Sequence, residues 1–144
     1  MKILTATVLL FLNFACSDKI VKPTMNEAFT VKLKQSVALE NDLSVKFADV
    51  QESRCPEGVQ CIRAGELFAT VELTDKGISK AVKFCISGEC IDKKLNYGSE
   101  INYSGDAISV GSSDYRVEVI DFTPKINTQS TSMDEYSLIL KIGK

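Results

Sequence analysis

The chain has 144 residues, of which 44% are hydrophobic and 8% aromatic, enough to bury the core of one domain. Its 17 basic and 19 acidic residues are scattered without blocks of one sign, which argues against a nucleic-acid partner because phosphate binding needs a clustered basic surface. The chain has no histidine, so it lacks the base of Ser-His-Asp and Cys-His catalysis and the ligands of an HExxH metal site.

The N-terminal segment, residues 1–15, has a basic second residue, then an uncharged and mostly apolar run that ends at Ala15, directly before Cys16. The run is too short to remain in a bilayer as a spanning helix, which takes about 20 apolar residues. This segment resembles a bacterial lipoprotein signal peptide, although Asn13 and Phe14 replace the usual aliphatic and small residues. The resemblance implies that residues 1–15 are removed and that Cys16 is lipidated. Simple secretion would need a small residue where Asn13 stands.

The cysteine count supports lipidation independently. Five cysteines are an odd number, and an exported protein with an unpaired cysteine needs an explanation. Lipidation of Cys16 leaves an even set of four: Cys55, Cys61, Cys85 and Cys90. Two or more acyl chains make membrane attachment stable. We therefore expect a lipid-anchored protein of a bacterial cell envelope, on the outer membrane or cell surface, with the membrane as one partner.

The rest of the chain divides into a short tether and one domain. Residues 16–28 show no periodicity and contain few large apolar groups, which predicts a flexible tether. The domain is expected to run from residue 29 to residue 144. Within it, apolar and polar side chains alternate with period two over several short stretches, which is typical of half-buried strands. Strands are predicted at 29–33, 43–47, 66–73, 82–86, 115–119 and 136–142, with shorter candidates at 96–103 and 107–111.

Turn residues separate these strands, at 40–42, 75–77, 87–89, 104–106 and 111–114. The polar stretch 124–135 lacks alternation, so we expect it to be an exposed loop. No window repeats its apolar residues at helical spacing. The sequence therefore predicts an all-β domain, a single antiparallel sandwich or barrel of about eight strands, stapled by disulfides.

The stretch FCISGEC, residues 84–90, predicts one of the disulfides. If Ser87 and Gly88 are the central residues of a hairpin turn, Cys85 lies opposite Cys90 in a pair whose side chains are close enough to bond. The remaining partners, Cys55 and Cys61, would then close a ring of five residues. Four cysteines allow three pairings, and a crossed pairing would restrict the unfolded chain more, so the alternatives stay open.

Two other uses of the cysteines fit the sequence less well. Structural zinc sites usually separate paired ligands by two to four residues; four residues separate Cys85 from Cys90, but five separate Cys55 from Cys61. An exported protein also meets oxidising conditions, which favour disulfides over zinc-bound thiolates. The two-residue spacing of a redox dithiol is also absent. We predict no metal ligand and no cofactor.

The segment DVQESRCPEGVQCIRAGELFATVEL, residues 49–73, carries a motif of the form S-R-C-P-x4-C-x-x-A-G. It resembles an uncharacterised family of small exported bacterial proteins, commonly lipoproteins, in which a strand, a short cysteine ring and a second strand follow one another. Arg63 stands where that family usually has an aromatic residue. The resemblance implies an architecture and no activity.

The ring and its flanks are the candidate binding loop, made of Arg54, Pro56, Glu57, Gly58, Val59, Gln60 and Arg63. The two arginines could instead form ion pairs with Glu52 or Glu66. Gly65 is expected to take a positive φ or a bulge where the loop enters its strand.

Three functions remain open at this point. The first is a binding or accessory module that presents its stapled loop to an envelope protein or a polymer. The second is a protease-inhibitor-like protein that offers the Cys55–Cys61 ring to an enzyme as a rigid loop. The third, a small enzyme that uses surface carboxylates such as Asp49, Glu52, Glu57 and Glu66, is the least favoured, because mingled charges near a loop are usually solvated or paired. We therefore expect a protein that is not an enzyme.

Overall fold

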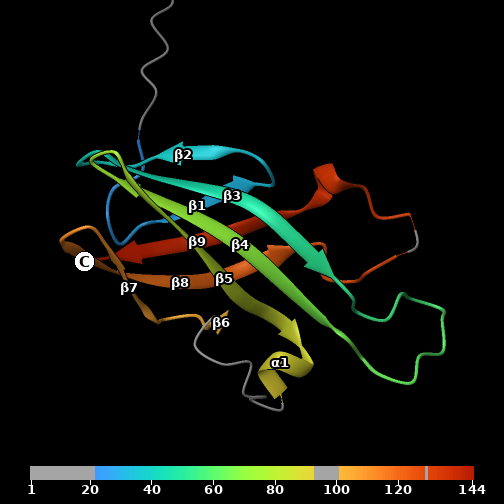
Figure 1. Ribbon diagram of the computed structural model, residues 1–144. Coiled ribbons are helices and arrows are strands. Elements are labelled where there is room, and N and C mark those ends of the chain that lie inside the picture. Colours follow the sequence, from blue (N-terminus) through green and yellow to red (C-terminus); the bar gives the residue numbers. More distant parts are fainter. Residues whose placement is uncertain (1–21, 93–100, 129) are drawn as a thin grey trace, which may run out of the picture.

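The computed structural model describes residues 22–92, 101–128 and 130–144, which form two β-sheets (Figure 1). One sheet has the strand order β1 (Ala28–Lys32), β9 (Ser137–Gly143), β8 (Ser113–Thr123), β7 (Ala107–Val110). The other has the order β2 (Ser36–Ala38), β3 (Leu43–Glu52), β4 (Glu66–Asp75), β5 (Ile78–Gly88), β6 (Ile101–Asn102). All neighbouring strands are antiparallel except β5 and β6.

Every second side chain along the strands of each sheet points into the space between the two sheets. The alternation of apolar and polar residues that predicted the strands therefore matches the alternation of buried and exposed side chains. The five-stranded sheet contributes Val45, Phe47, Val71, Leu73 and Phe84, and the four-stranded sheet contributes Val31, Val117, Leu138, Leu140 and Ile142. Each of these side chains is almost completely buried. The predicted all-β class is confirmed, and the packing of two sheets makes it a sandwich.

Most of the predicted strands are present in the described part of the chain, several of them longer than expected. β3 extends to Glu52 and β8 to Thr123, while β2 was not predicted because three residues carry too little alternation. Of the candidate strand at 96–103, residues 96–100 lie outside the described residues, and Ile101–Asn102 form β6. The polar stretch 124–135 is a largely exposed loop that ends in the 3-10 helix η1 (Met133–Glu135).

The predicted hairpin at Ser87 and Gly88 is wrong, although Cys85 and Cys90 do form a disulfide with Cα atoms 6.0 Å apart. Ser87 and Gly88 are the last residues of β5 and pair with β4, Gly88 opposite Glu66, so they cannot form a turn. A single helical turn, α1 (Glu89–Asp92), follows β5 in place of a returning strand. The disulfide therefore holds a helical turn against the end of β5.

Residues 1–21 lie outside the described residues, including the predicted signal peptide and Cys16. Within the segment predicted as a tether, Met25 packs against the core and the Asn26 amide donates to the Ile142 carbonyl oxygen at 2.8 Å. The residues just before β1 are thus attached to the domain. In the described part of the chain, no helix has both the length and the apolar character needed to cross a bilayer.

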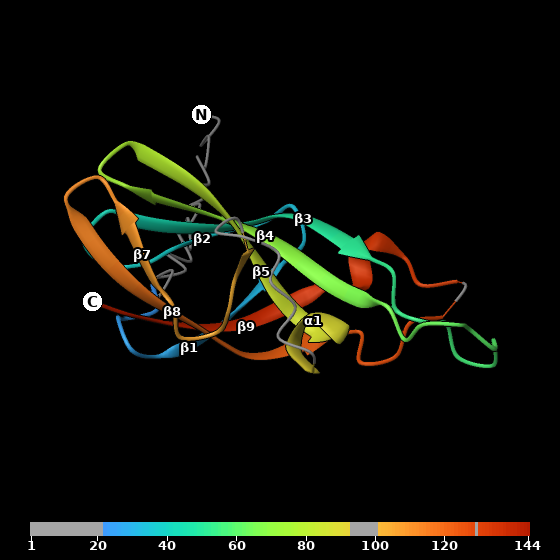
Figure 2. The same cartoon turned by 60° about the horizontal axis from the view of Figure 1, so that its bottom comes forward.

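Two long connections extend from the same end of the sandwich. Residues 53–65 join β3 to β4, and residues 124–136 join β8 to β9. Figures 1 and 2 show both connections, green and orange to red, on the side of the molecule away from the β4–β5 turn. The candidate binding loop predicted from sequence lies in the first of them.

Candidate functional site

The β3–β4 connection ends in a small disulfide ring. Cys55 and Cys61 are bonded, with Cα atoms 5.9 Å apart, so the predicted local pairing is confirmed. Two backbone bonds continue the β3–β4 ladder below the ring, from the Ser53 amide to the Glu66 carbonyl oxygen at 2.9 Å and from the Cys55 amide to the Ala64 carbonyl oxygen at 2.8 Å. The ring therefore stands on a hydrogen-bonded base rather than on a free loop.

Arg54, directly before the ring, is buried and binds groups of its own chain. Its Nη2 lies 2.5 Å from Oε2 of Glu52, and its Nε donates to Oε1 of Glu52 at 2.9 Å. Of the two partners considered for the arginines, Glu52 forms an ion pair with Arg54. The guanidinium also donates to two carbonyl oxygens of the other connection, those of Pro124 at 3.0 Å and Lys125 at 2.9 Å. Arg54 thus fastens the base of the ring to a segment about seventy residues away.

The carboxylate of Glu52 is enclosed by donors. Besides the guanidinium, it accepts hydrogen bonds from the Arg54 amide at 2.9 Å and from the Tyr136 hydroxyl at 3.1 Å. Burial of the Tyr136 ring, together with the charge and hydrogen bond of Glu52, raises the pKa of Tyr136 to about 12. The Arg54 guanidinium carbon lies 5.4 Å from the centre of the Phe122 ring. These contacts satisfy a charged pair that would be costly to bury alone.

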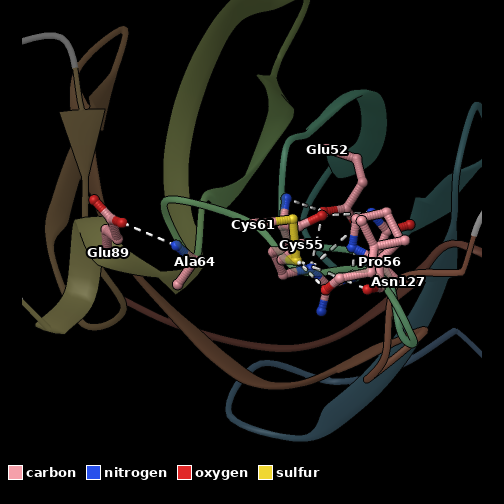
Figure 3. The surroundings of a disulfide bond; sticks show 9 residues. Glu52, Cys55, Pro56, Cys61, Ala64, Glu89 and Asn127 are labelled. Atoms are coloured by element: carbon pink, nitrogen blue, oxygen red, sulfur yellow. Dashed lines mark hydrogen bonds and ion pairs between the residues drawn. A yellow bond between two sulfur atoms is a disulfide. The ribbon is translucent and has the colours of Figure 1, made fainter.

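Asn127 makes a second link between the two connections. Its side-chain Nδ2 donates to the Arg54 carbonyl oxygen at 2.7 Å, and its own carbonyl oxygen accepts from the Glu57 amide at 2.8 Å. Figure 3 shows Asn127 next to Pro56, which is one of the ring residues. We call residues 53–65 together with 124–128 the ring unit, because these bonds join them into one body.

Glu89 supports the far side of the ring unit. It is 5% exposed, and its Oε2 accepts from Nη2 of Arg63 at 2.7 Å and from Nε of Arg63 at 3.1 Å. Its Oε1 accepts from the Ala64 amide at 3.1 Å, the bond drawn in Figure 3. Glu89 begins α1, which the Cys85–Cys90 disulfide holds in place. The second disulfide therefore supports the first loop through Glu89.

Sequence reasoning did not name Glu89 as a partner of Arg63. The signal that could have identified Glu89 is its position directly before Cys90, once Cys85–Cys90 is known to hold a helical turn.

Glycine is required where the ring unit joins the sheet. Gly65 has a φ of +71°, as expected from the sequence, and a Cβ there would lie 1.9 Å from the Ser53 carbonyl oxygen. Gly88 has a φ of +94°, and a Cβ there would lie 2.2 Å from the Gly65 carbonyl oxygen. Three backbone segments thus approach one another more closely than any side chain allows.

The outer surface of the ring unit is exposed and partly apolar. The predicted binding residues Glu57, Gly58, Val59 and Gln60 are exposed and Pro56 is half-buried. Ile62 is completely exposed at 104%, and Ile126 is 56% exposed. Sequence reasoning did not single out these two isoleucines, since neither belongs to an alternating pattern. The exposed surface is therefore more apolar than the predicted set of residues.

Comparison of the chain with family models, curated proteins and solved structures gives no match. The resemblance to small exported lipoproteins accordingly stays a prediction.

The chemistry that the site can perform follows from its own residues. Within residues 22–92, 101–128 and 130–144, no three His, Cys, Asp or Glu side chains are grouped so that they could hold a metal ion. Of the carboxylates considered for catalysis, Glu52 is bound by Arg54 and Tyr136, and Asp49 lies 3.2 Å from Nζ of Lys34. The ring unit protrudes from the sandwich, and the bonds of Arg54 and Asn127 hold its base.

Proposed function

We propose that this protein is a binding or accessory module, lipid-anchored in a bacterial cell envelope, and that the ring unit is its binding surface. One observation carries the proposal: the buried guanidinium of Arg54 fixes both connections, while the residues above it are exposed. A surface whose backbone is already ordered loses little conformational entropy when a partner binds. The contacts that order this loop lie beneath it, which leaves its outer face for a partner.

The proposed location rests on the cysteines and the N-terminal segment. Cys16 follows a segment that resembles a lipoprotein signal, and the other four cysteines are bonded in pairs. Disulfides persist in oxidising compartments outside the cytosol, which agrees with an exported protein. Mass spectrometry of the mature N-terminal peptide tests this. We expect an acylated Cys16, and an unmodified Met1 on mature protein would contradict the proposal.

The way in which the carboxylates are used supports the proposal of a non-enzymatic role. Catalysis by a carboxylate pair needs two groups that can reach a substrate. Glu52 is enclosed by Arg54 and Tyr136, whereas Glu57 is exposed on the ring. Glu52 therefore acts as a structural partner of the arginine, and we assign it no catalytic part.

A protease-inhibitor-like role is the second candidate, and the complete exposure of Ile62 beside the Cys61 disulfide favours it. A rigid loop that displays an aliphatic side chain could occupy a specificity pocket without being cleaved. Incubation with purified serine, cysteine and metalloproteases tests this candidate. Inhibition by the wild type that is lost in Ile62→Asp would support it, and rapid cleavage of the ring without inhibition would refute it.

The main proposal is tested by capture of partners in the native envelope. Cells express the lipidated full-length protein, or a variant in which residues 56–60 are replaced by glycine and serine while both ring cysteines are kept. A control variant carries Ser112→Ala, an exposed residue in the β7–β8 turn. After chemical cross-linking, we expect the wild type and the control to capture a partner that the ring variant does not. Identical captures by all three would contradict the proposal.

A further inference from the structure

Three exposed aliphatic side chains belong to the ring unit. Ile62 is 104% exposed, Ile126 is 56% exposed and Val59 is 41% exposed. Single exposed hydrophobic residues are common on protein surfaces and need no explanation. These three are different, because the bonds of Asn127 to Arg54 and Glu57 place Ile126 beside the loop that carries the other two.

Ile62 is the most exposed of the three and its backbone is held on both sides. Before it, Cys61 is bonded to Cys55. After it, the Arg63 guanidinium and the Ala64 amide both bind the buried carboxylate of Glu89. An aliphatic side chain that is completely exposed on an ordered backbone can enter a pocket at little entropic cost.

The charges of the ring unit indicate what kind of partner it suits. The ring unit has one acidic residue, Glu57, and three basic residues, Arg54, Arg63 and Lys125. The guanidinium of Arg54 binds the carboxylate of Glu52. The guanidinium of Arg63 binds Glu89, and Nζ of Lys125 binds Asp121. Anionic lipids and phosphate polymers require clusters of basic residues, which this surface does not present in its described part. Because each basic group of the ring unit is paired with a carboxylate, its exposed aliphatic groups suit an apolar protein surface instead.

We infer that the ring unit binds a folded protein by inserting Ile62 into an apolar pocket, with Val59 and Ile126 covering the rim. This inference rests on the proposed binding function and specifies its partner and its anchor residue. A protruding loop fits a concave site, and a central side chain that becomes desolvated carries most of the affinity of such interfaces. The surrounding polar groups, among them Gln60, contribute mainly complementarity.

The first step of the test locates the contact. A photoreactive amino acid replaces Ile62 in the lipidated full-length protein in its own envelope. In a matched control it replaces Ile78, which is 54% exposed and is the first residue of β5, opposite Asp75 at the end of β4 that lies away from the ring. We expect an adduct with a protein from position 62 and none from position 78. Adducts only with lipid or polysaccharide, or no adduct from position 62, would overturn the inference.

The second step measures affinity with that protein, purified, by isothermal titration calorimetry. Ile62→Ser should weaken binding roughly 10- to 100-fold, the effect of losing one buried aliphatic side chain. Ile62→Val should keep most of the affinity, and Gln60→Ser should change it about twofold or less. None of these changes touches a buried group, so folding is preserved.

The outcomes separate this inference from the proposed function. If Ile62→Ser binds as tightly as the wild type while replacement of residues 56–60 abolishes binding, the anchor is refuted and the binding function stands. If neither change affects binding, both are refuted.

Discussion

Arg54→Ala should be the most damaging single change in the ring unit. The substitution leaves the Glu52 carboxylate, whose side chain is 14% exposed, without its cation, and removes the bonds that Arg54 donates to the carbonyl oxygens of Pro124 and Lys125. Breaking a buried ion pair by removing one partner costs about 3–5 kcal/mol. Glu52 keeps the Tyr136 hydroxyl and the residue 54 amide as donors, so we expect a loss of about 3 kcal/mol of unfolding free energy.

The assay is chemical denaturation with the disulfides intact, followed by circular dichroism because the chain has no tryptophan. Lys141→Ala is the control, since the pair of Lys141 and Glu118 is partly exposed and should contribute at most about 1 kcal/mol. The double variant Arg54→Met with Glu52→Leu should lose less stability than the two single changes added together, because no charge is left unpaired. An Arg54→Ala variant as stable as Lys141→Ala would refute the reasoning.

Three further predictions concern the ring, its glycines and the buried tyrosine. The Cys55–Cys61 disulfide should be reduced before the Cys85–Cys90 disulfide, because Cys61 is exposed and Cys90 is completely buried. Alkylation of the free thiols during a titration with dithiothreitol measures this order. Simultaneous reduction of the two disulfides would contradict the prediction. Gly65→Ala should lose more than about 2 kcal/mol of unfolding free energy, because the new Cβ would meet the Ser53 carbonyl oxygen. In Gly58→Ala the new Cβ meets nothing within 4 Å, so the loss should be about 1 kcal/mol. Equal losses in the two variants would argue against the close approach at Gly65. The pKa of Tyr136 is raised to about 12, so its stabilising contribution should be complete below pH 10 and disappear as the pH rises toward 12. Tyrosine ionisation is followed by absorbance at 295 nm. If Tyr136→Phe leaves this titration unchanged, the assignment of the raised pKa to Tyr136 is refuted.

Local patterns predicted much of this fold. The alternation at 43–47 and 66–73 identified β3 and β4, because one face of each strand packs against the other sheet and the opposite face meets solvent. The ring pairing followed from proximity, and the positive φ of Gly65 followed from its place at a strand entry.

The hairpin prediction failed because a local signal was weighed without its distant partner. Ser and Gly between two cysteines are typical of a two-residue turn. In the protein, the end of β5 continues to pair with β4, and Gly88 allows the backbone to pass the Gly65 carbonyl oxygen. The pairing of the cysteines was correct even though the geometry that suggested it was not.

The bonds of Arg54 and Asn127 that join the two connections could not be predicted from local patterns. Arg54 donates hydrogen bonds to residues that lie 70 and 71 positions further along the chain, and the Asn127 side chain donates to the Arg54 carbonyl oxygen, 73 positions back. No periodicity or turn signal links segments at that separation. The sequence indicated which loop matters, and the second loop that completes the surface became visible only in three dimensions.

The central claim is that the ring and residues 124–128 form one ordered body before any partner binds. Backbone order parameters from ¹⁵N relaxation of the free protein test this most directly. We expect values near 0.85, typical of rigid backbone, for the amides of Glu57 and Val59 in the ring, of Ile62 directly after it, and of residues 126–128. Values below about 0.6 in either segment would contradict the claim that Arg54 and Asn127 hold a pre-organised binding surface.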